Sequence, residues 1–137
     1  MMVVFESLQK RAIRIITYAK FDADTTPLFA KLKLLKLQDI ITLHVACFMY
    51  NYTKSNIPNA FNSFFTAVNK RHAYNTRLAS KSSFEFPKVR TNYGKFNTRF
   101  LGPKVWNGID ESLKNLSYRG FKREHKTQFL ILYNSDS

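Results

Sequence analysis

The amino-acid sequence predicts a mainly α-helical fold: a small helical bundle with a long basic loop, which permits one short β-hairpin near residues 84–97. Apolar residues recur three and four positions apart toward both ends of the chain, as amphipathic helices require. Residues 66–97 lack this spacing and are rich in Asn, Ser, Thr, Lys and Arg. A chain of 137 residues is short enough for a single domain, and its 13 Phe residues argue against disorder.

The first predicted element is an amphipathic helix. Its apolar positions follow helical spacing and are Val4, Phe5, Leu8, Ala12, Ile15, Ile16 and Ala19. We expect the helix to end near Lys20, because the next stretch, "FDADTTP", contains turn formers and a proline. Thr26 can cap a short second helix, in which Pro27 takes the first position and no amide hydrogen bond is lost.

A longer helix is predicted from Leu37 to about Lys54, where apolar residues surround the helical wheel and indicate a central, buried element. It carries His44, expected as a core histidine, and Cys47, expected as a buried thiol. The single cysteine cannot form an internal disulfide, which favours a reducing intracellular compartment, the cytoplasm or the nucleus. No segment reaches the roughly 20 apolar residues that cross a bilayer, so we expect no membrane partner.

The basic loop is expected at residues 66–97, after a turn or two of helix in "IPNAFNSFF". Within it, "FEFPKVR" alternates like a strand and would place Phe84 and Phe86 on one face. Pro87 cannot donate to a ladder, so only an edge strand is allowed. A turn signal at residues 92–94 would complete a weak hairpin.

The stretch "FLGPKVWNGI" holds the only tryptophan of the chain. Pro103 suits the first position of a helix and Gly108 suits a left-handed exit, so we expect one capped turn. Trp106 is then a core anchor rather than a stacking site. A short helix follows from Asp110, and a final helix from about Ser117 places on one side Phe121, His125, Phe129 and Leu132.

These elements divide the single domain, 1–137, into a helical half at 1–65, the basic loop or hairpin at 66–97, short helices at 98–133 and a tail at 134–137. No catalytic constellation occurs along them, and no cofactor or metal site is expected. Asp22 and Asp24 lack the further ligands of a calcium loop and are better explained as turn or capping residues. The 3 histidines stand far apart, without cysteine or carboxylate at zinc-ligand spacing.

Charge is the strongest compositional signal, because 22 Lys and Arg against 9 Asp and Glu give a net charge of +13. Between Ile40 and Ile109 the only acid is Glu85. Such a field attracts polyanions, of which nucleic acid is the commonest and an anionic membrane surface the second. The alternative is that the excess charge only keeps the chain in solution.

Basic and flat side chains come together in "KRHAYNTRLASK" and again near "FEFPKVRTNYGK". The predicted phosphate contacts are Lys70, Arg71, Arg77, Lys81, Lys88, Arg90 and Lys95. Unstacked bases could lie on His72, Tyr74 and Tyr93. In the alternative interpretation, Asn75 and Thr76 form a turn, Tyr74 packs on the core and Arg77 satisfies helix carbonyls.

Several motifs occur in an order that points to a known family. They are "ESLQKRAIRIIT", "TPLFAKLKLLKLQDI", "FMYNY", "HAYNTR", "FLGPKVWNGI" and "FKREHKTQFL". Together, from about Leu8 to Leu132, they resemble the region that follows the polymerase domain in reverse transcriptases of non-LTR retrotransposons, of the jockey-like and LINE type. In that family Leu-Pro usually follows the Trp-Asn pair, whereas Gly108, Ile109 and Asp110 follow it here.

The resemblance implies a C-terminal appendage that helps hold template RNA or target DNA beside a polymerase. The chain lacks the adjacent aspartates of the family's palm and its endonuclease domain, so no catalytic residue carries over. Two alternatives stay open. The chain is a structural or interaction module that packs on a polymerase, on another helical partner or on itself through the first helix, or it is an unselected remnant of an element.

Overall fold

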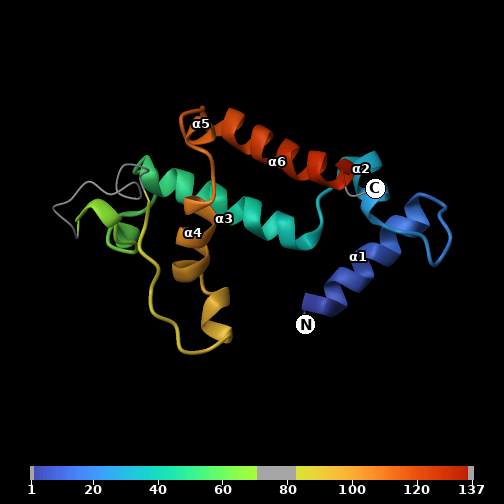
Figure 1. Cartoon of the computed structure of the whole chain (residues 1–137), viewed down its shortest axis with the longest axis horizontal. Coiled ribbons are helices and arrows are strands. Elements are labelled where there is room, and N and C mark those ends of the chain that lie inside the picture. The colour runs from blue at the N-terminus through green and yellow to red at the C-terminus, as the bar shows by residue number, and fades with distance from the viewer. Residues whose placement is uncertain (1, 71–82, 136–137) are drawn as a thin grey trace. The chain divides into compact units, whose positions relative to one another are not determined.

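The computed structural model describes residues 2–70 and 83–135, and these residues form helices joined by turns and extended segments (Figure 1). The α-helices are α1 (Met2–Ile16), α2 (Thr26–Leu32), α3 (Leu37–Thr53), α4 (Thr98–Asn107), α5 (Glu111–Lys114) and α6 (Tyr118–Ser135). Single turns of 3-10 helix form η1 (Asn59–Phe61), η2 (Val68–Lys70) and η4 (Tyr93–Phe96). The mainly α prediction is confirmed. No helix among the described residues has the length and apolar character needed to cross a membrane.

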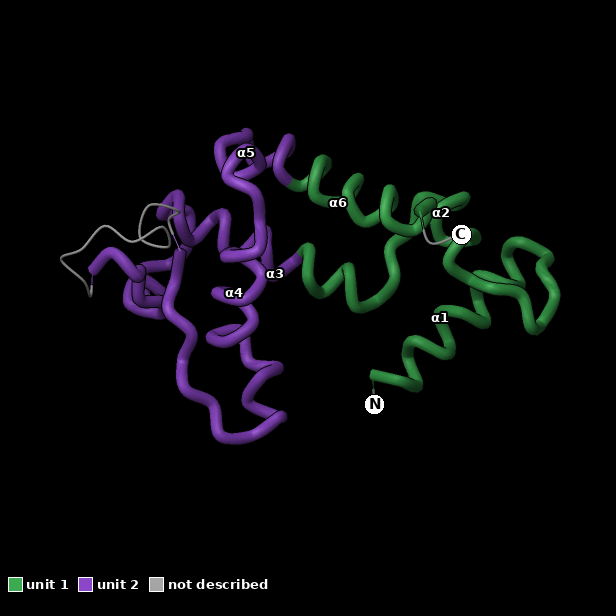
Figure 2. Tube along the Cα trace, viewed as in Figure 1, with its two compact units in different colours: residues 1–43, 122–137 green, residues 44–121 purple. Residues whose placement is uncertain are grey.

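The chain divides into two compact units, coloured separately in Figure 2. Unit 1 comprises residues 1–43 and 122–137, and unit 2 comprises residues 44–121. Helices α3 and α6 contribute residues to both units. Each unit is described by itself below, and the single domain expected from the sequence stays a prediction.

In unit 1, α1 ends at Ile16, four residues before the predicted end at Lys20. Tyr18 adopts a left-handed backbone with φ 53°, and the Ala19 amide donates to the Arg14 carbonyl at 2.9 Å. This is a Schellman motif, which closes the orphan carbonyls of a helix end. The next helix starts as predicted to within one residue, because the Asp24 carboxylate accepts from the Thr26 amide and Pro27 lies in the first turn.

Polar side chains fasten the start of α3 to the other helices of unit 1. The Gln9 amide of α1 donates to the Leu35 carbonyl and accepts from the Leu37 amide, both at 3.0 Å. The Tyr133 hydroxyl of α6 accepts from the Lys36 amide and donates to the Asp39 carboxylate. Burial, and then the bond to Asp39, raises the pKa of the Tyr133 phenol. Two amides that lack partners within α3 are therefore satisfied by distant side chains.

The core of unit 1 is small. Its buried hydrophobic side chains are Ile13, Phe29, Leu35, Leu43 and Tyr133. On α6, His125 is buried, but Leu132, which was predicted to share its side of the helix, is exposed, and Tyr133 is buried one residue later. The Tyr133 hydroxyl reaches the polar groups at the start of α3, which a leucine side chain cannot bond.

In unit 2, an aromatic cluster packs against the second half of α3. Rings of Tyr52, Phe65 and Phe84 meet with centroids 4.9–5.8 Å apart, mostly edge to face. This geometry suits the ring quadrupole and adds to the burial of apolar area. The Cys47 thiol is buried as predicted, whereas His44 is exposed, which corrects its prediction as a core histidine.

In helix α4, the predicted roles of Pro103 and Gly108 are wrong. Pro103 lies inside α4 rather than at its first position, and Asn97 caps the helix by accepting from the Arg99 amide at 2.9 Å. Gly108 has φ −87°, a right-handed backbone, and its amide donates to the Val105 carbonyl at 3.2 Å. The chain therefore does not leave α4 through a left-handed turn. Position 102 requires glycine because α4 packs closely on its neighbours there: a Cβ would lie 2.7 Å from Met49 Sδ and 2.8 Å from Phe65 Cζ.

Trp106 is a core residue, as predicted, with 2 % of its surface exposed. Its ring centroid lies 6.1 Å from that of Phe121. The buried Lys114 ammonium lies over the Trp106 ring, 4.9 Å from its centroid, and 2.9 Å from Glu111 Oε1. A buried cation needs such partners, because burial disfavours charge.

The hairpin permitted near residues 84–97 does not form. Phe84 makes one isolated bridge with Ala67, and Tyr93–Phe96 close into the 3-10 turn η4. Phe84 is buried and Phe86 is exposed, so the two do not share a face as a strand would require. Pro87 offers no amide for a ladder, and no second strand lies beside it among the described residues.

Candidate nucleic-acid interface

A segment of unit 2, residues 86–96, presents cations and aromatic rings to solvent, and we call it the basic–aromatic segment. Its exposed rings are those of Phe86, Tyr93 and Phe96, at 54 %, 89 % and 68 % of their surface. Its exposed cations are Lys88, Arg90 and Lys95. Contiguous exposed apolar groups mark contact surfaces, whereas single exposed rings are ordinary.

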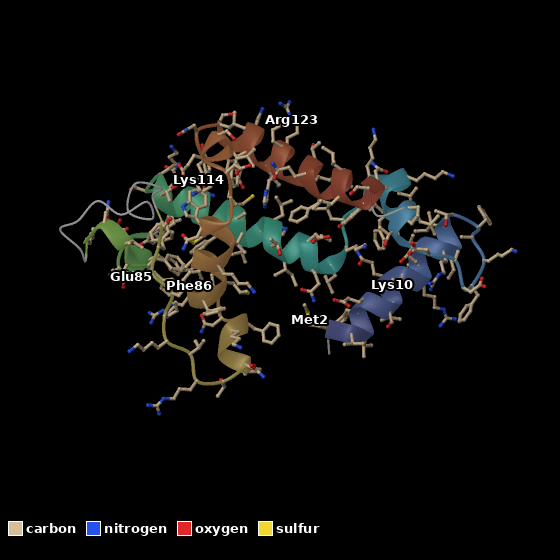
Figure 3. The ribbon with its side chains drawn as sticks, viewed as in Figure 1. Met2, Lys10, Glu85, Phe86, Lys114 and Arg123 are labelled. Atoms are coloured by element: carbon tan, nitrogen blue, oxygen red, sulfur yellow. The ribbon has the colours of Figure 1, made fainter. Side chains whose placement is uncertain are left out.

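The base of this segment is anchored by Asn107, at the end of α4. The Asn107 side-chain oxygen accepts from the Phe84 amide, and its nitrogen donates to the Phe84 carbonyl, both at 2.9 Å. This two-bond clamp holds the extended chain against the helix just before Glu85 and Phe86, which Figure 3 labels. Asn107 thus positions the segment without being part of it.

Backbone bonds tie the same region to η2. The Val68 amide donates to the Ser83 carbonyl at 3.0 Å, and the Glu85 amide donates to the Thr66 carbonyl at 2.9 Å. Lys70, exposed at the end of η2, is thereby joined through the backbone to the start of the segment. An open pocket of about 520 Å³ lies beside Lys70 and is lined among others by Ser83 and Phe84, but by no residue of the segment.

The far end of the segment is shaped by η4. The Gly94 amide donates to Thr91 Oγ1 at 3.1 Å, and Lys95 Nζ donates to Asn92 Oδ1 at 3.2 Å. A Cβ on Gly94 would lie 3.3 Å from Val89 Cγ1, so the turn packs closely on the middle of the segment. The local fold therefore fixes the backbone beneath Tyr93 and Lys95 while their side chains remain outside.

Neighbouring groups extend the same chemistry into α4. The Arg99 guanidinium stacks on Phe64, with Cζ 4.5 Å from the ring centroid, and the Phe86 ring lies 6.1 Å from that of Phe100. Within residues 83–109 the only acid is Glu85, which is half-buried. The exposed charge of the segment is therefore positive throughout.

Five of the predicted nucleic-acid-binding residues belong to this described region: Lys70, Lys88, Arg90, Tyr93 and Lys95. All five are exposed, and the last four lie on the basic–aromatic segment. The other five lie outside the described residues: Arg71, His72, Tyr74, Arg77 and Lys81. Their assignment stays a prediction.

Two residues of this region were not singled out from the sequence. The spacing around Phe96 does not distinguish it from the other phenylalanines, and its exposure is evident only in the structure. Asn107 belongs to the stretch predicted as one capped turn, and its clamp on Phe84 joins residues 23 positions apart, which local spacing cannot indicate.

The exposed groups of the basic–aromatic segment have the chemistry for contact with a polyanion. Exposed ammonium and guanidinium groups can meet phosphates, and exposed rings can stack on unpaired bases. The described residues contain no group of His, Cys, Asp and Glu side chains that could hold a metal ion. Asp24 instead supports the turn before α2, as expected.

Comparison with known proteins adds no relative to this picture. No family model, no curated protein and no solved structure matches the chain.

Proposed function

We propose that the chain is a non-catalytic module of a retrotransposon reverse transcriptase. This module binds single-stranded RNA or DNA, mainly through the phosphates of the nucleic-acid backbone. One observation carries the binding role: Tyr93 and Phe96 are exposed at 89 % and 68 %, with the exposed Lys95 between them. Stacking of these rings on bases would bury apolar surface that the fold leaves exposed to water, and this burial would stabilise the complex. The family assignment rests on the ordered motifs of the sequence.

The proposal entails an intracellular role, in the cytoplasm or the nucleus, where RNA and DNA are present and Cys47 stays reduced. The family assignment has a test of its own. The reading frame upstream of this sequence in its genome should encode a polymerase palm with adjacent aspartates and an endonuclease domain. An upstream frame that encodes unrelated proteins would remove the retrotransposon assignment and leave the binding role to its own experiment.

Binding to single-stranded RNA and to DNA of the same sequence should be largely electrostatic. We expect the logarithm of the affinity to fall with the logarithm of salt concentration, by about 0.7 per phosphate neutralised. Replacing Lys88, Arg90 and Lys95 by Gln should lower that slope by about 2. The measurement is fluorescence anisotropy of labelled oligonucleotides across a salt series.

The matched control removes three exposed lysines of unit 1, Lys20, Lys31 and Lys122, and so lowers the net charge equally. It should change the slope much less. Tyr93→Ala should weaken binding by about 1–3 kcal/mol, while Tyr18→Ala, at an equally exposed ring of unit 1, should have little effect. Equal losses in both sets would mean that net charge alone attracts the oligonucleotide, and the interface would be elsewhere.

We propose a protein-interaction role as a second candidate, in which the chain packs on a polymerase domain, on another helical protein or on a second copy. The observation that favours it is the apolar side of α1. Its large side chains are more than half exposed: Val3, Val4, Phe5, Leu8, Ile15 and Ile16. Helices of stable proteins bury such a side.

A further inference from the structure

The first turns of α6 carry a row of cations on one side of the helix. The exposed residues are Arg119, Lys122, Arg123 and Lys126. Their spacing of three and four positions places them within about 100° of the helix circumference. We call these residues the α6 cation face. Figure 3 labels Arg123, whose side chain projects outward from α6.

No carboxylate of α6 compensates this charge along the helix. An acid three or four positions away would pair with a member of the face, but no acid occupies any of those positions. Among the described residues, Arg123 alone of the face has an ion-pair partner, with its Nε 3.4 Å from Glu124 Oε1. The two side chains are 78 % and 45 % exposed, and an ion pair in water contributes little.

The place of the face within the helix adds to its cost. The first turn of a helix carries positive partial charge and favours acidic side chains, whereas the first turn of α6 has none. Arg119 lies in that turn, and Lys122 and Arg123 lie in the next. Like charges three and four positions apart also destabilise a helix. Cations that lower the stability of their own helix indicate contact with an anionic partner.

The chemistry of the face favours a nucleic-acid duplex as this partner. Over about 10 Å, the length of the face, a duplex presents about six phosphates, twice as many as a single strand. The face offers no free ring to unstacked bases, because Tyr118 beside it packs on Tyr50 with ring centroids 5.8 Å apart. Paired bases need no such ring, since they are already stacked on one another.

A protein partner, a second copy and a lipid surface fit the face less well. Protein interfaces bury apolar and aromatic side chains at their centre, and the α6 cation face has none. A second copy would bring the same cations against these, with a net charge of +13 on each chain. Helices that lie on a bilayer insert an apolar side next to their cations, which is likewise absent here.

We propose that the α6 cation face binds the phosphate backbone of a double-stranded nucleic acid. This site is separate from the basic–aromatic segment, to which the proposed function assigns single strands. Its contacts are electrostatic and do not depend on base sequence. The inference goes beyond the proposed function, and the two stand or fall independently.

The test uses the full chain and a short, blunt-ended, labelled DNA duplex, with fluorescence anisotropy across a salt series. The face variant replaces Arg119, Arg123 and Lys126 by Gln. Lys122 stays in place because it belongs to the unit 1 control for single strands. We expect the slope of log affinity against log salt to fall by about 2.7, since each phosphate contact with a duplex contributes about 0.9.

The matched control is the segment variant, in which Gln replaces Lys88, Arg90 and Lys95. It removes the same charge from the other site and should leave the duplex slope nearly unchanged. The face variant, in turn, should leave binding of single strands nearly unchanged. It should also unfold at a higher urea concentration, because like charges near the start of α6 are gone. A loss of duplex binding then has a cause other than a lost fold.

Each result decides for or against the duplex site. Equal losses of duplex slope in the two variants would mean that net charge alone attracts the duplex, and would overturn the proposal. A face variant that loses single strands as well would show no preference for paired strands, with the same consequence. Displacement of the duplex by an acidic helical peptide at equal charge concentration would assign the face to a protein.

The same measurements keep the two proposals apart. If single strands bind through the segment and the duplex does not bind, this inference is wrong and the proposed function remains. If the duplex binds through the face and single strands do not bind, the proposed function is wrong and this inference remains.

Discussion

At the scale of single residues, Gly102 occupies a position whose constraint comes from tertiary contact. In the sequence it stands beside Pro103 in a stretch predicted as one capped turn, whereas the structure places it inside α4, in contact with α3 and Phe65. The contact involves residues far away in the sequence. Spacing rules alone therefore cannot reveal that this position excludes a methyl group.

Gly102→Ala should lower the free energy of unfolding. The added Cβ would lie 2.7 Å from Met49 Sδ and 2.8 Å from the Phe65 ring, and such overpacking costs about 1–3 kcal/mol. Higher helix propensity offsets roughly 0.5–1 kcal/mol of this. Urea unfolding provides the measurement. Gly108→Ala is the control, because its Cβ would meet nothing closer than 3.6 Å; equal effects of the two changes would show that propensity, not contact, dominates.

At the scale of elements, most helices could be predicted from apolar spacing, while their ends depended on backbone bonds. Helix α3 was predicted from Leu37 to about Lys54 and ends at Thr53. The end of α1 was placed four residues too late, since a tyrosine in a left-handed conformation gives no sequence signal. The hairpin does not form because Tyr93–Phe96 close into a 3-10 turn instead of a second strand, and Asn107 anchors Phe84.

Helix α3 ends in the same way as α1. Ser55 has φ 57°, and the Asn56 amide donates to the Asn51 carbonyl at 2.9 Å. A side chain in this left-handed region is strained, and glycine is not. Ser55→Gly should therefore raise the free energy of unfolding by about 0.5–1 kcal/mol, measured by urea denaturation. Ser55→Ala keeps the strain and should give no gain; a gain with alanine as well would point to the serine hydroxyl.

At the scale of the whole molecule, the charge of the chain and the uneven burial of its apolar residues set its behaviour. The positive net charge was evident from composition, and so was the expectation of a polyanionic partner. Composition could not show where apolar groups stay uncovered, because the α1 residues have ordinary helical spacing. Only the packing of Ile13 and Gln9 into unit 1 turns Leu8 and Ile15 outward.

Stability should depend on pH through His125, which is buried on α6. Burial disfavours the imidazolium and lowers the pKa of His125 below its ordinary value of 6.5. As pH falls through about 6.5, the unfolded chain takes up this proton before the folded chain does, so the free energy of unfolding decreases. It levels off below the lowered pKa of the folded state.

Urea unfolding between about pH 7.5 and 5.5 measures this dependence. His125→Leu should flatten it whatever it does to absolute stability, since the titrating group is gone. His44→Gln, at an exposed position of α3, is the control and should keep the slope of the parent chain. A slope that survives His125→Leu would assign the pH dependence to other groups.

The solitary Trp106 gives the molecule a built-in optical probe. Because its indole is buried in unit 2 beside Phe121, excitation at the red edge of protein absorption reports emission from that unit and from no part of unit 1. Far-ultraviolet dichroism sees the helices of both. Denaturation followed by the two signals together would reveal whether unit 1, with its thin core, melts before the aromatic cluster does. The position of one ring thus makes it directly observable whether the two units unfold together or separately.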